Sequence, residues 1–144
     1  MVKKIVLVVL LVASSLHAEA LKWAKDFNSG IERAKKEHKP VMFVYSRHGC
    51  KYCMLLEGDT FSNQGIVKNL NKNFISVVSY SDENDYIPRE LWRPGTPTIW
   101  FLDSDGMPMY QPIMGYVDSK QFPQILEVVK LDFKKLSNPK KVKK

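Results

Sequence analysis

The sequence predicts an α/β sandwich, with a mixed central sheet of about four strands and helices on both of its faces. Short β-branched and aromatic runs alternate with segments whose apolar residues recur every three or four positions. A strong turn, Asp103-Ser104-Asp105-Gly106, joins the last two predicted strands as a hairpin. The chain has 144 residues, no internal repeat and no sign of a second domain. This order of elements is typical of a single layered domain.

The first predicted helix covers residues 21–38 and ends at His38-Lys39-Pro40. Its apolar positions are spaced by four, four and three residues: Trp23, Phe27, Ile31 and Ala34. Gly30 is expected to weaken this helix. A buried strand at 41–45 follows, and then a helix that ends near Glu57, before Gly58.

The second half of the chain continues the alternation of helices and strands. The remaining predicted elements are a short helix (63–70), a strand (74–80), a polar loop (81–95), a strand (98–102), a strand (109–113) and a helix (119–136). Ser62 or Asn63 can cap the short helix. Pro108 and Pro112 place the last strand at an edge of the sheet, because proline cannot donate to the ladder.

Residues 1–20 have the three parts of a secretory signal peptide: Lys3 and Lys4, an apolar run at 5–13, and the small-residue pattern Ala18-Glu19-Ala20. The apolar run is too short to cross about 30 Å of hydrocarbon as a helix. We therefore expect export to the periplasm and removal of residues 1–20, with cleavage after Ala18 as a second option. An uncleaved leader that anchors the protein to the membrane is the alternative.

The net charge of +7 comes largely from lysines near the C-terminus. Residues 137–144 are expected to form a basic, disordered tail after a domain that covers residues 21–136. The tail has no interleaved aromatic residues, so nucleic-acid binding is not expected.

The chain contains only two cysteines, Cys50 and Cys53, at the point where a strand gives way to a helix. Residues separated by three positions share a helix face, so the two sulfurs can form a disulfide. The free N–H groups and the dipole at a helix N-terminus stabilise a thiolate on Cys50. An unperturbed thiol is only about 3% ionised at pH 7, and about 2 kcal/mol is needed to lower its pKa to about 7. Cys53, one turn further, is expected to be the resolving thiol.

Two other uses of the cysteines are less favoured. A structural disulfide that closes so short a loop constrains little of the unfolded chain. A structural zinc site needs about four ligands, and His38 and His48 do not stand at a familiar spacing from the cysteines. We expect no metal, and no cofactor other than the redox-active disulfide of Cys50 and Cys53.

The sequence resembles the thioredoxin-fold superfamily at three separated places: Cys50-Lys51-Tyr52-Cys53 after its strand, Gly95-Thr96-Pro97-Thr98, and Gly115 before the last helix. Together they cover about residues 21–136. Leu56-Glu57 and the residues that follow are similar to the exported thioredoxin-like branch.

The resemblance implies a cis peptide bond between Thr96 and Pro97 that faces the cysteines, with the backbone of Thr96 pairing with the substrate chain. This sequence departs from thioredoxin at Gly49, where the family has tryptophan, at Lys51-Tyr52, where it has Gly-Pro, and at Val44, where it has a buried aspartate.

Four other residues are candidates for tuning the thiols. Glu57 shares a helix face with the cysteines and could replace the missing aspartate as a proton relay, although a surface glutamate paired with a lysine is the favoured interpretation. His48, Lys51 and Tyr52 flank Cys50 and could influence its thiolate.

The resulting prediction is a monomeric, exported thiol–disulfide oxidoreductase that reduces disulfides in exported proteins. A membrane electron donor would keep its dithiol reduced. The reductase direction is favoured because there is no room for the dimerisation region of an isomerase or the helical insertion of a strong oxidase. The alternatives are a disulfide oxidase or isomerase, and a peptide- or partner-binding module without redox turnover.

Overall fold

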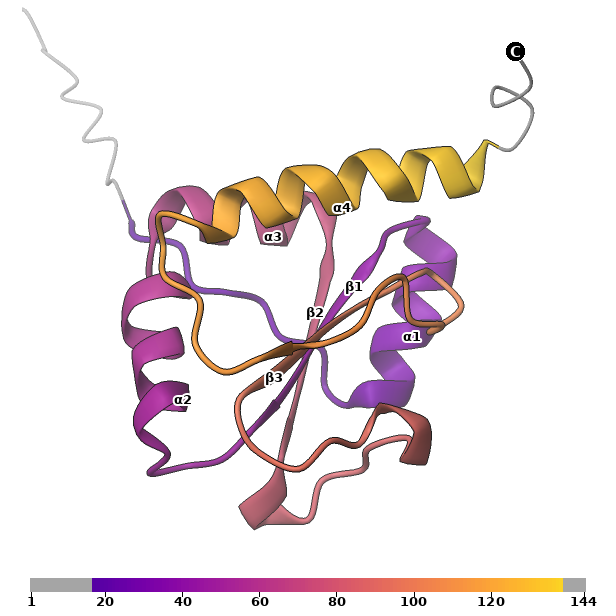
Figure 1. The fold of residues 1–144 in the computed structure, drawn as a ribbon. Helices are drawn as coiled ribbons and strands as arrows, with labels where there is room; N and C mark the ends of the chain where they lie inside the picture. The colour runs from indigo at the N-terminus through magenta and orange to yellow at the C-terminus, as the bar shows by residue number, and fades with distance from the viewer. Residues whose placement is uncertain (1–16, 139–144) are drawn as a thin grey trace, which may run out of the picture.

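The computed structural model describes residues 17–138 (Figure 1). Most of the predicted leader and of the basic tail, residues 1–16 and 139–144, lies outside the described residues. The helices and strands, in chain order, are α1 (Phe27–Glu37), β1 (Val41–Ser46), α2 (Lys51–Leu55), the π-helical turn η1 (Leu56–Thr60), α3 (Gln64–Asn73), β2 (Ile75–Tyr80), the 3₁₀ turns η2 (Ser81–Glu83) and η3 (Arg89–Leu91), β3 (Thr98–Leu102), β4 (Ile113–Met114) and α4 (Phe122–Ser137). Within residues 17–138, no helix is both long enough and apolar enough to cross a membrane.

The four strands form one mixed sheet in the order β2-β1-β3-β4. β1 runs parallel to β2 and antiparallel to β3, and β3 runs antiparallel to β4. The parallel connection from β1 to β2 passes through α2, η1 and α3, which start at the carboxyl end of β1. Cys50 therefore lies at that edge of the sheet, where α/β proteins commonly place their ligands.

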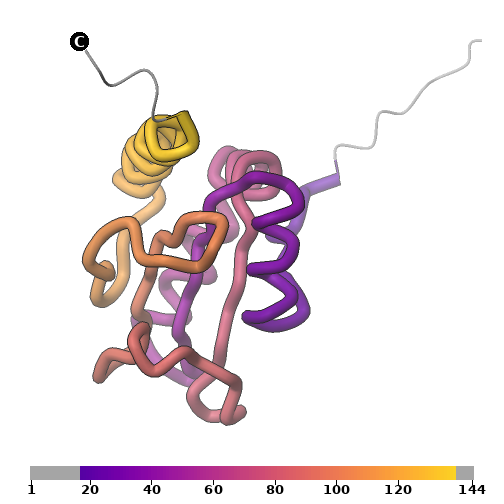
Figure 2. The backbone as a smooth tube through the Cα atoms, turned by 90° about the vertical axis from the view of Figure 1, so that its right-hand side faces the viewer, coloured from indigo at the N-terminus to yellow at the C-terminus, as the bar shows by residue number. Residues whose placement is uncertain are grey.

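Helices cover both faces of the sheet, which confirms the predicted class (Figure 2). The alternation of side chains along β1 separates two cores. Met42 and Val44 belong to the core beneath α3 and α4, whereas Val41 and Phe43 belong to the core beneath α1.

The first helix is shorter than predicted. Asp26 caps α1 by accepting a hydrogen bond from the backbone N–H of Ser29, and the Ser29 hydroxyl in turn accepts one from the N–H of Asp26. Trp23, predicted as the first residue of the helical stripe, instead forms a parallel bridge with Ser76 and packs on the opposite face of the sheet from α1. A capping box thus begins the helix one turn after the start of its apolar pattern.

Two other boundaries differ from the prediction. The helix after the cysteines does not end before Gly58, because η1 continues the turns to Thr60.

The hairpin turn forms as predicted, with the N–H groups of Asp105 and Met107 donating to the Asp103 carboxylate. The strand predicted at 109–113 is reduced to a bridge at Pro108 and to β4, because a proline at 108 or 112 has no N–H for the ladder.

Candidate active site

Cys50 occupies the N-cap position of α2, directly after the loop that leaves β1. Gly49, just before it, has a φ of 71°, in the left-handed region that glycine adopts without strain. Apart from its two chain neighbours, no residue has an atom within 4 Å of the place where a Gly49 side chain would begin, so the backbone angle rather than crowding favours glycine here. The turn allows the Cys50 side chain to fold back over the first turn of α2.

The Cys50 sulfur has hydrogen-bond partners in the first turn of α2 and in the loop before β3. The backbone N–H of Cys53 donates to the Cys50 Sγ at 3.3 Å, and the Cys50 thiol can donate to the carbonyl oxygen of Thr96 at 3.5 Å. Partial burial raises the pKa of Cys50. Hydrogen bonds from the side chains of Cys53 and Thr96 and from the N–H groups of Cys53 and Tyr52 outweigh that effect, so the pKa lies below its ordinary value. Cys50 is therefore the thiol that ionises first.

Cys53 has the opposite character. It is only 2% exposed, and burial, together with its hydrogen bond to Cys50, raises its pKa above the ordinary value. The side chain of Ser46, the buried last residue of β1, hydrogen-bonds to Cys53 and partly offsets this rise. The two thiols thus differ in environment: Cys50 is partly exposed, whereas Cys53 is buried.

The loop before β3 completes the site. The peptide bond between Thr96 and Pro97 is cis, in agreement with the geometry that the family resemblance implies. Gly115 donates its N–H to the Pro97 carbonyl at 2.8 Å, and the Thr98 hydroxyl donates to Gly95 at 2.9 Å. The three separated sequence motifs therefore meet at the cis bond, where Thr96 contacts Cys50 and Pro97 binds Gly115.

Comparison with known proteins agrees with this arrangement. Residues 27–130 match the family model described as a thioredoxin-like domain. The chain belongs to this thioredoxin-like family. Among relatives, 61 residues are 33% identical to spermatogenesis-associated protein 20 of Rattus norvegicus, a match that covers 42% of this chain but 8% of that protein.

Solved structures support the fold of this thioredoxin-like domain. A thioredoxin from Thermus thermophilus aligns with a TM-score of 0.68 at 19% identity, covering 87% of this chain and 98% of the other. A structure titled DsbH oxidoreductase aligns with a TM-score of 0.59 at 16% identity, covering 79% and 88% of the two chains. Identities this low establish a common fold and leave the activity to be argued from the site.

His48 is held beside the site by the end of β2. Its ring stacks on Tyr80 with the centroids 4.1 Å apart, and its Nδ1 lies 3.0 Å from an Asp82 carboxylate oxygen. The backbone N–H of His48 donates to the other oxygen of Asp82 at 3.2 Å. These contacts fix the loop before Cys50, so His48 is placed to act through the position of that loop.

Glu57 has a different partner from the expected one. The pairing with a nearby lysine that was favoured from the sequence is wrong: the Tyr80 hydroxyl donates to the Glu57 carboxylate at 3.3 Å. Burial and the charge of Glu57 raise the pKa of Tyr80 to about 12, so this phenol remains a donor. Glu57 is exposed and its carboxylate is bound by Tyr80. Its partner is therefore Tyr80 and not the buried thiol of Cys53, for which Glu57 is the candidate proton relay.

Lys51 and Tyr52 lie on the exposed start of α2. The Lys51 ammonium sits 5.7 Å from the centre of the Tyr52 ring, and half of the Tyr52 surface is exposed. This pair borders the approach to Cys50. Among residues 17–138, no three His, Cys, Asp or Glu side chains gather closely enough to hold a metal ion.

Sequence reasoning missed three residues of the site: Ser46, Tyr80 and Asp82. Ser46 ends the strand before the cysteines, two residues after the position of the missing family aspartate, and that proximity was the available signal. Tyr80 ends β2, where it pairs with Ser46 at the end of β1, and Asp82 lies in the η2 turn that follows. Only the strand pairing brings them beside His48.

Proposed function

We propose that this thioredoxin-like domain is an exported thiol–disulfide oxidoreductase that reduces disulfides in other exported proteins. The single observation that carries the proposal is the Cys50 sulfur, which has a lowered pKa, is partly accessible and is next to the Thr96–Pro97 cis bond. A protected second thiol three residues away supplies the resolving group.

The reaction begins when the Cys50 thiolate attacks one sulfur of a client disulfide. The client S–S bond breaks, its other sulfur leaves as a thiolate, and Cys50 is joined to the client as a mixed disulfide. Cys53 then loses its proton and attacks the Cys50 sulfur, which expels the second client thiolate. Two electrons pass to the client, and the two cysteines are left as a disulfide.

Thr96 and Pro97 are proposed to hold the client chain during the mixed-disulfide stage. Thr96 is half-buried and its carbonyl lies beside the Cys50 sulfur, so an extended client backbone that pairs with Thr96 would bring its disulfide to Cys50. A membrane electron donor with its own dithiol is proposed to reduce the Cys50–Cys53 disulfide after each turnover. The protein is proposed to act as a monomer in the periplasm.

The midpoint potential of the cysteine pair tests the direction of electron flow. Equilibration with glutathione or thioredoxin couples is expected to give a value near that of thioredoxin, about −270 mV. A value near about −120 mV would show that the pair is an oxidant and would overturn the reductase assignment.

Trapping of clients tests the activity itself. The Cys53→Ala variant is expected to accumulate mixed disulfides with exported proteins that dithiothreitol releases, because the resolving thiol is gone. The matched Cys50→Ala variant is expected to trap none. A Cys50 that reacts no faster than an ordinary thiol and traps nothing would instead favour the binding-module alternative.

A further inference from the structure

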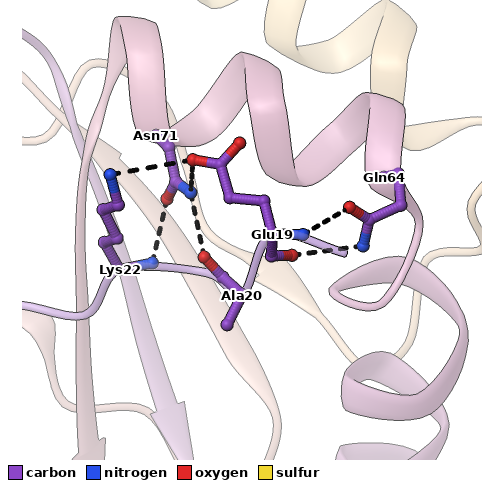
Figure 3. A network of polar contacts seen from close by, with 5 residues as sticks. All are labelled: Glu19, Ala20, Lys22, Gln64 and Asn71. Atoms are coloured by element: carbon purple, nitrogen blue, oxygen red, sulfur yellow. Dashed lines mark hydrogen bonds and ion pairs between the residues drawn. The ribbon is translucent and has the colours of Figure 1, made fainter. Parts of the chain in front are cut away.

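A short segment ahead of α1, residues 19–22, is held against α3 by two amide side chains (Figure 3). Gln64 binds both sides of one residue: its Oε1 accepts from the N–H of Glu19 at 2.8 Å, and its Nε2 donates to the Glu19 carbonyl at 3.1 Å. This pairing copies the two hydrogen bonds of a strand ladder. Glu19 is therefore a docked part of the fold.

Asn71, two helical turns further along α3, hydrogen-bonds to residues 19, 20 and 22. Its Nδ2 donates to the carbonyl of Ala20 and to the carboxylate of Glu19, both at 2.9 Å, and its Oδ1 accepts from the N–H of Lys22 at 2.9 Å. The Lys22 ammonium lies 3.7 Å from the same carboxylate. Leu21, between these contacts, packs against the core beneath α3 and α4.

The hydrogen bonds from Gln64 and Asn71 to residues 19–22 form a clamp on this segment. The clamp affects the two possible processing sites differently. The Ala20–Leu21 bond lies between the Ala20 carbonyl and the Lys22 N–H, and both of these groups bind Asn71. Cutting there would also remove every contact of Glu19 and Ala20 with α3. The Ala18–Glu19 bond lies at the outer end of the docked segment, and Ala18 is exposed. Whether a fold tolerates the loss of a terminal segment depends on the burial and hydrogen bonding of the backbone that is removed.

We infer that maturation cuts the chain between Ala18 and Glu19, so that the mature protein begins at Glu19 and keeps the clamp intact. This inference rests on the proposed export. Water adds across the Ala18–Glu19 peptide bond, the leader departs with a carboxylate on Ala18, and Glu19 retains an ammonium group. That ammonium keeps a hydrogen to donate to Gln64 Oε1, now as a charge-assisted hydrogen bond.

The small residues before each cut give a different preference from the folded-state contacts. A cut after Ala20 places alanine at the last and third-last leader positions, whereas a cut after Ala18 places Leu16 at the third-last one. The pattern therefore favours the Ala20 site, and the folded-state contacts favour the Ala18 site. The two sites differ by two residues, which a mass measurement resolves.

The test is to express the full chain in a Gram-negative host, purify it from the periplasm, and determine its intact mass and N-terminal sequence. The expected first residue is Glu19. A product that begins at Leu21, or at any other residue, overturns the inference and leaves the export proposal standing. Full-length chain retained in the membrane overturns the cleaved-export proposal, and the inference with it.

A variant at position 20 separates the two sites independently. Ala20 is exposed, so Ala20→Gln should leave the fold unchanged while removing the small residue that a cut after position 20 needs. Under the inference, Ala20→Gln is processed as fully as the wild type. Ala18→Gln removes a small residue that either cut needs, so its precursor should accumulate in both cases and serves as the control for blocked processing. Accumulation of the Ala20→Gln precursor would contradict the inference.

The clamp can be tested on the same purified protein. Asn71→Ala is expected to lower the thermal midpoint and to speed hydrogen exchange at the Lys22 amide. Lys68→Ala, an exposed change on the same helix, should affect neither. Equal behaviour of the two variants would show that the clamp contributes nothing in solution and would remove the basis of the inference.

Discussion

At the residue scale, the chemistry depends on a difference between two sulfurs only three residues apart. Cys50 caps the helix and collects hydrogen bonds, whereas Cys53 is buried one turn further. The same contact between them lowers the pKa of Cys50 and raises that of Cys53. The Cys50 thiolate and the Cys53 thiol are therefore the favoured pair of protonation states.

Replacing Cys53 by alanine should raise the pKa of Cys50, because the thiolate loses one hydrogen-bond donor. A hydrogen bond to the charged form of an acid lowers its pKa, so the loss of this donor should move the ionisation of Cys50 to higher pH. The pH dependence of iodoacetamide alkylation measures it. An unchanged profile would show that the Cys53 side chain does not stabilise the thiolate.

Gly49→Ala should destabilise the protein by about 1–2 kcal/mol, because an L-residue at this left-handed backbone angle is strained. Gly58→Ala, in the helical turns after α2, is the control: it should be neutral or stabilising by up to about 1 kcal/mol. Urea unfolding of both variants measures the two changes. Equal effects would mean that the turn at Gly49 relaxes at no cost.

At the scale of elements, local preference and packing disagree in α1. Gly30 looked like a defect in a helix, but a side chain there would begin 2.4 Å from Cγ2 of Val77 on β2. Glycine lets α1 approach the sheet closely. The packing free energy gained there exceeds the helix propensity that glycine loses. The spacing of apolar residues along the chain does not show which position of a helix must lack a side chain.

Gly30→Ala should therefore destabilise the protein by about 1–3 kcal/mol, the usual cost of overpacking, although alanine is the better helix former. Adding Val77→Ala should recover part of the loss, since it removes the clashing methyl group. A double-mutant cycle by urea unfolding measures the coupling. Purely additive effects would contradict the close approach.

A second contact between elements joins the active-site helix to the loop before α4. The hydroxyl of Thr60, fully buried in η1, donates to the Val117 carbonyl. Thr60→Val preserves the shape and leaves that carbonyl unpaired, which should cost about 1–3 kcal/mol in urea unfolding. Ser62→Ala, on the exposed hydroxyl that donates to the Glu57 carbonyl, should cost clearly less. A reversed order would contradict the importance of burial.

At the scale of the whole molecule, anchored carboxylates tie distant parts of the chain together. Asp59 on η1 accepts hydrogen bonds from Tyr116 and from the backbone and hydroxyl of Ser119, and these contacts hold its pKa below the ordinary value. The carboxyl pKa values of five other residues are also lowered: Asp26, Glu37, Asp82, Glu127 and Asp132.

Stability should consequently fall in acid. A carboxyl group with a lowered folded-state pKa stabilises the fold above its unfolded value of about 4, and this contribution is lost as the pH drops through the folded value. The urea midpoint should be flat from about pH 7 to pH 5 and decline below about pH 4. Asp59→Asn should be less stable than the wild type at pH 7, and the difference should shrink in acid. A difference that does not change with pH would exclude the Asp59 charge as its cause.

The sequence by itself determined the fold class, the position of the cysteine pair and a cap of α3 at Ser62 or Asn63, of which the structure uses Asn63, because each is encoded in residues close together along the chain. Period, turn chemistry and cysteine spacing are local, and local interactions can be inferred before folding. The strand break at β4 was signalled by its prolines but underestimated, and the start of α1 was missed because a capping box competed with an apolar stripe.

The tertiary structure alone decided which residues surround the reactive pair. Ser46, Tyr80 and Asp82 reach the site only because β1 and β2 pair in register, and Gln64 and Asn71 meet the N-terminal segment across about fifty residues of chain. Contacts over such separations form when burial of the two cores fixes the packing of the sheet and its helices. Such long-range contacts leave no periodic pattern in the sequence, so they cannot be predicted from one sequence alone.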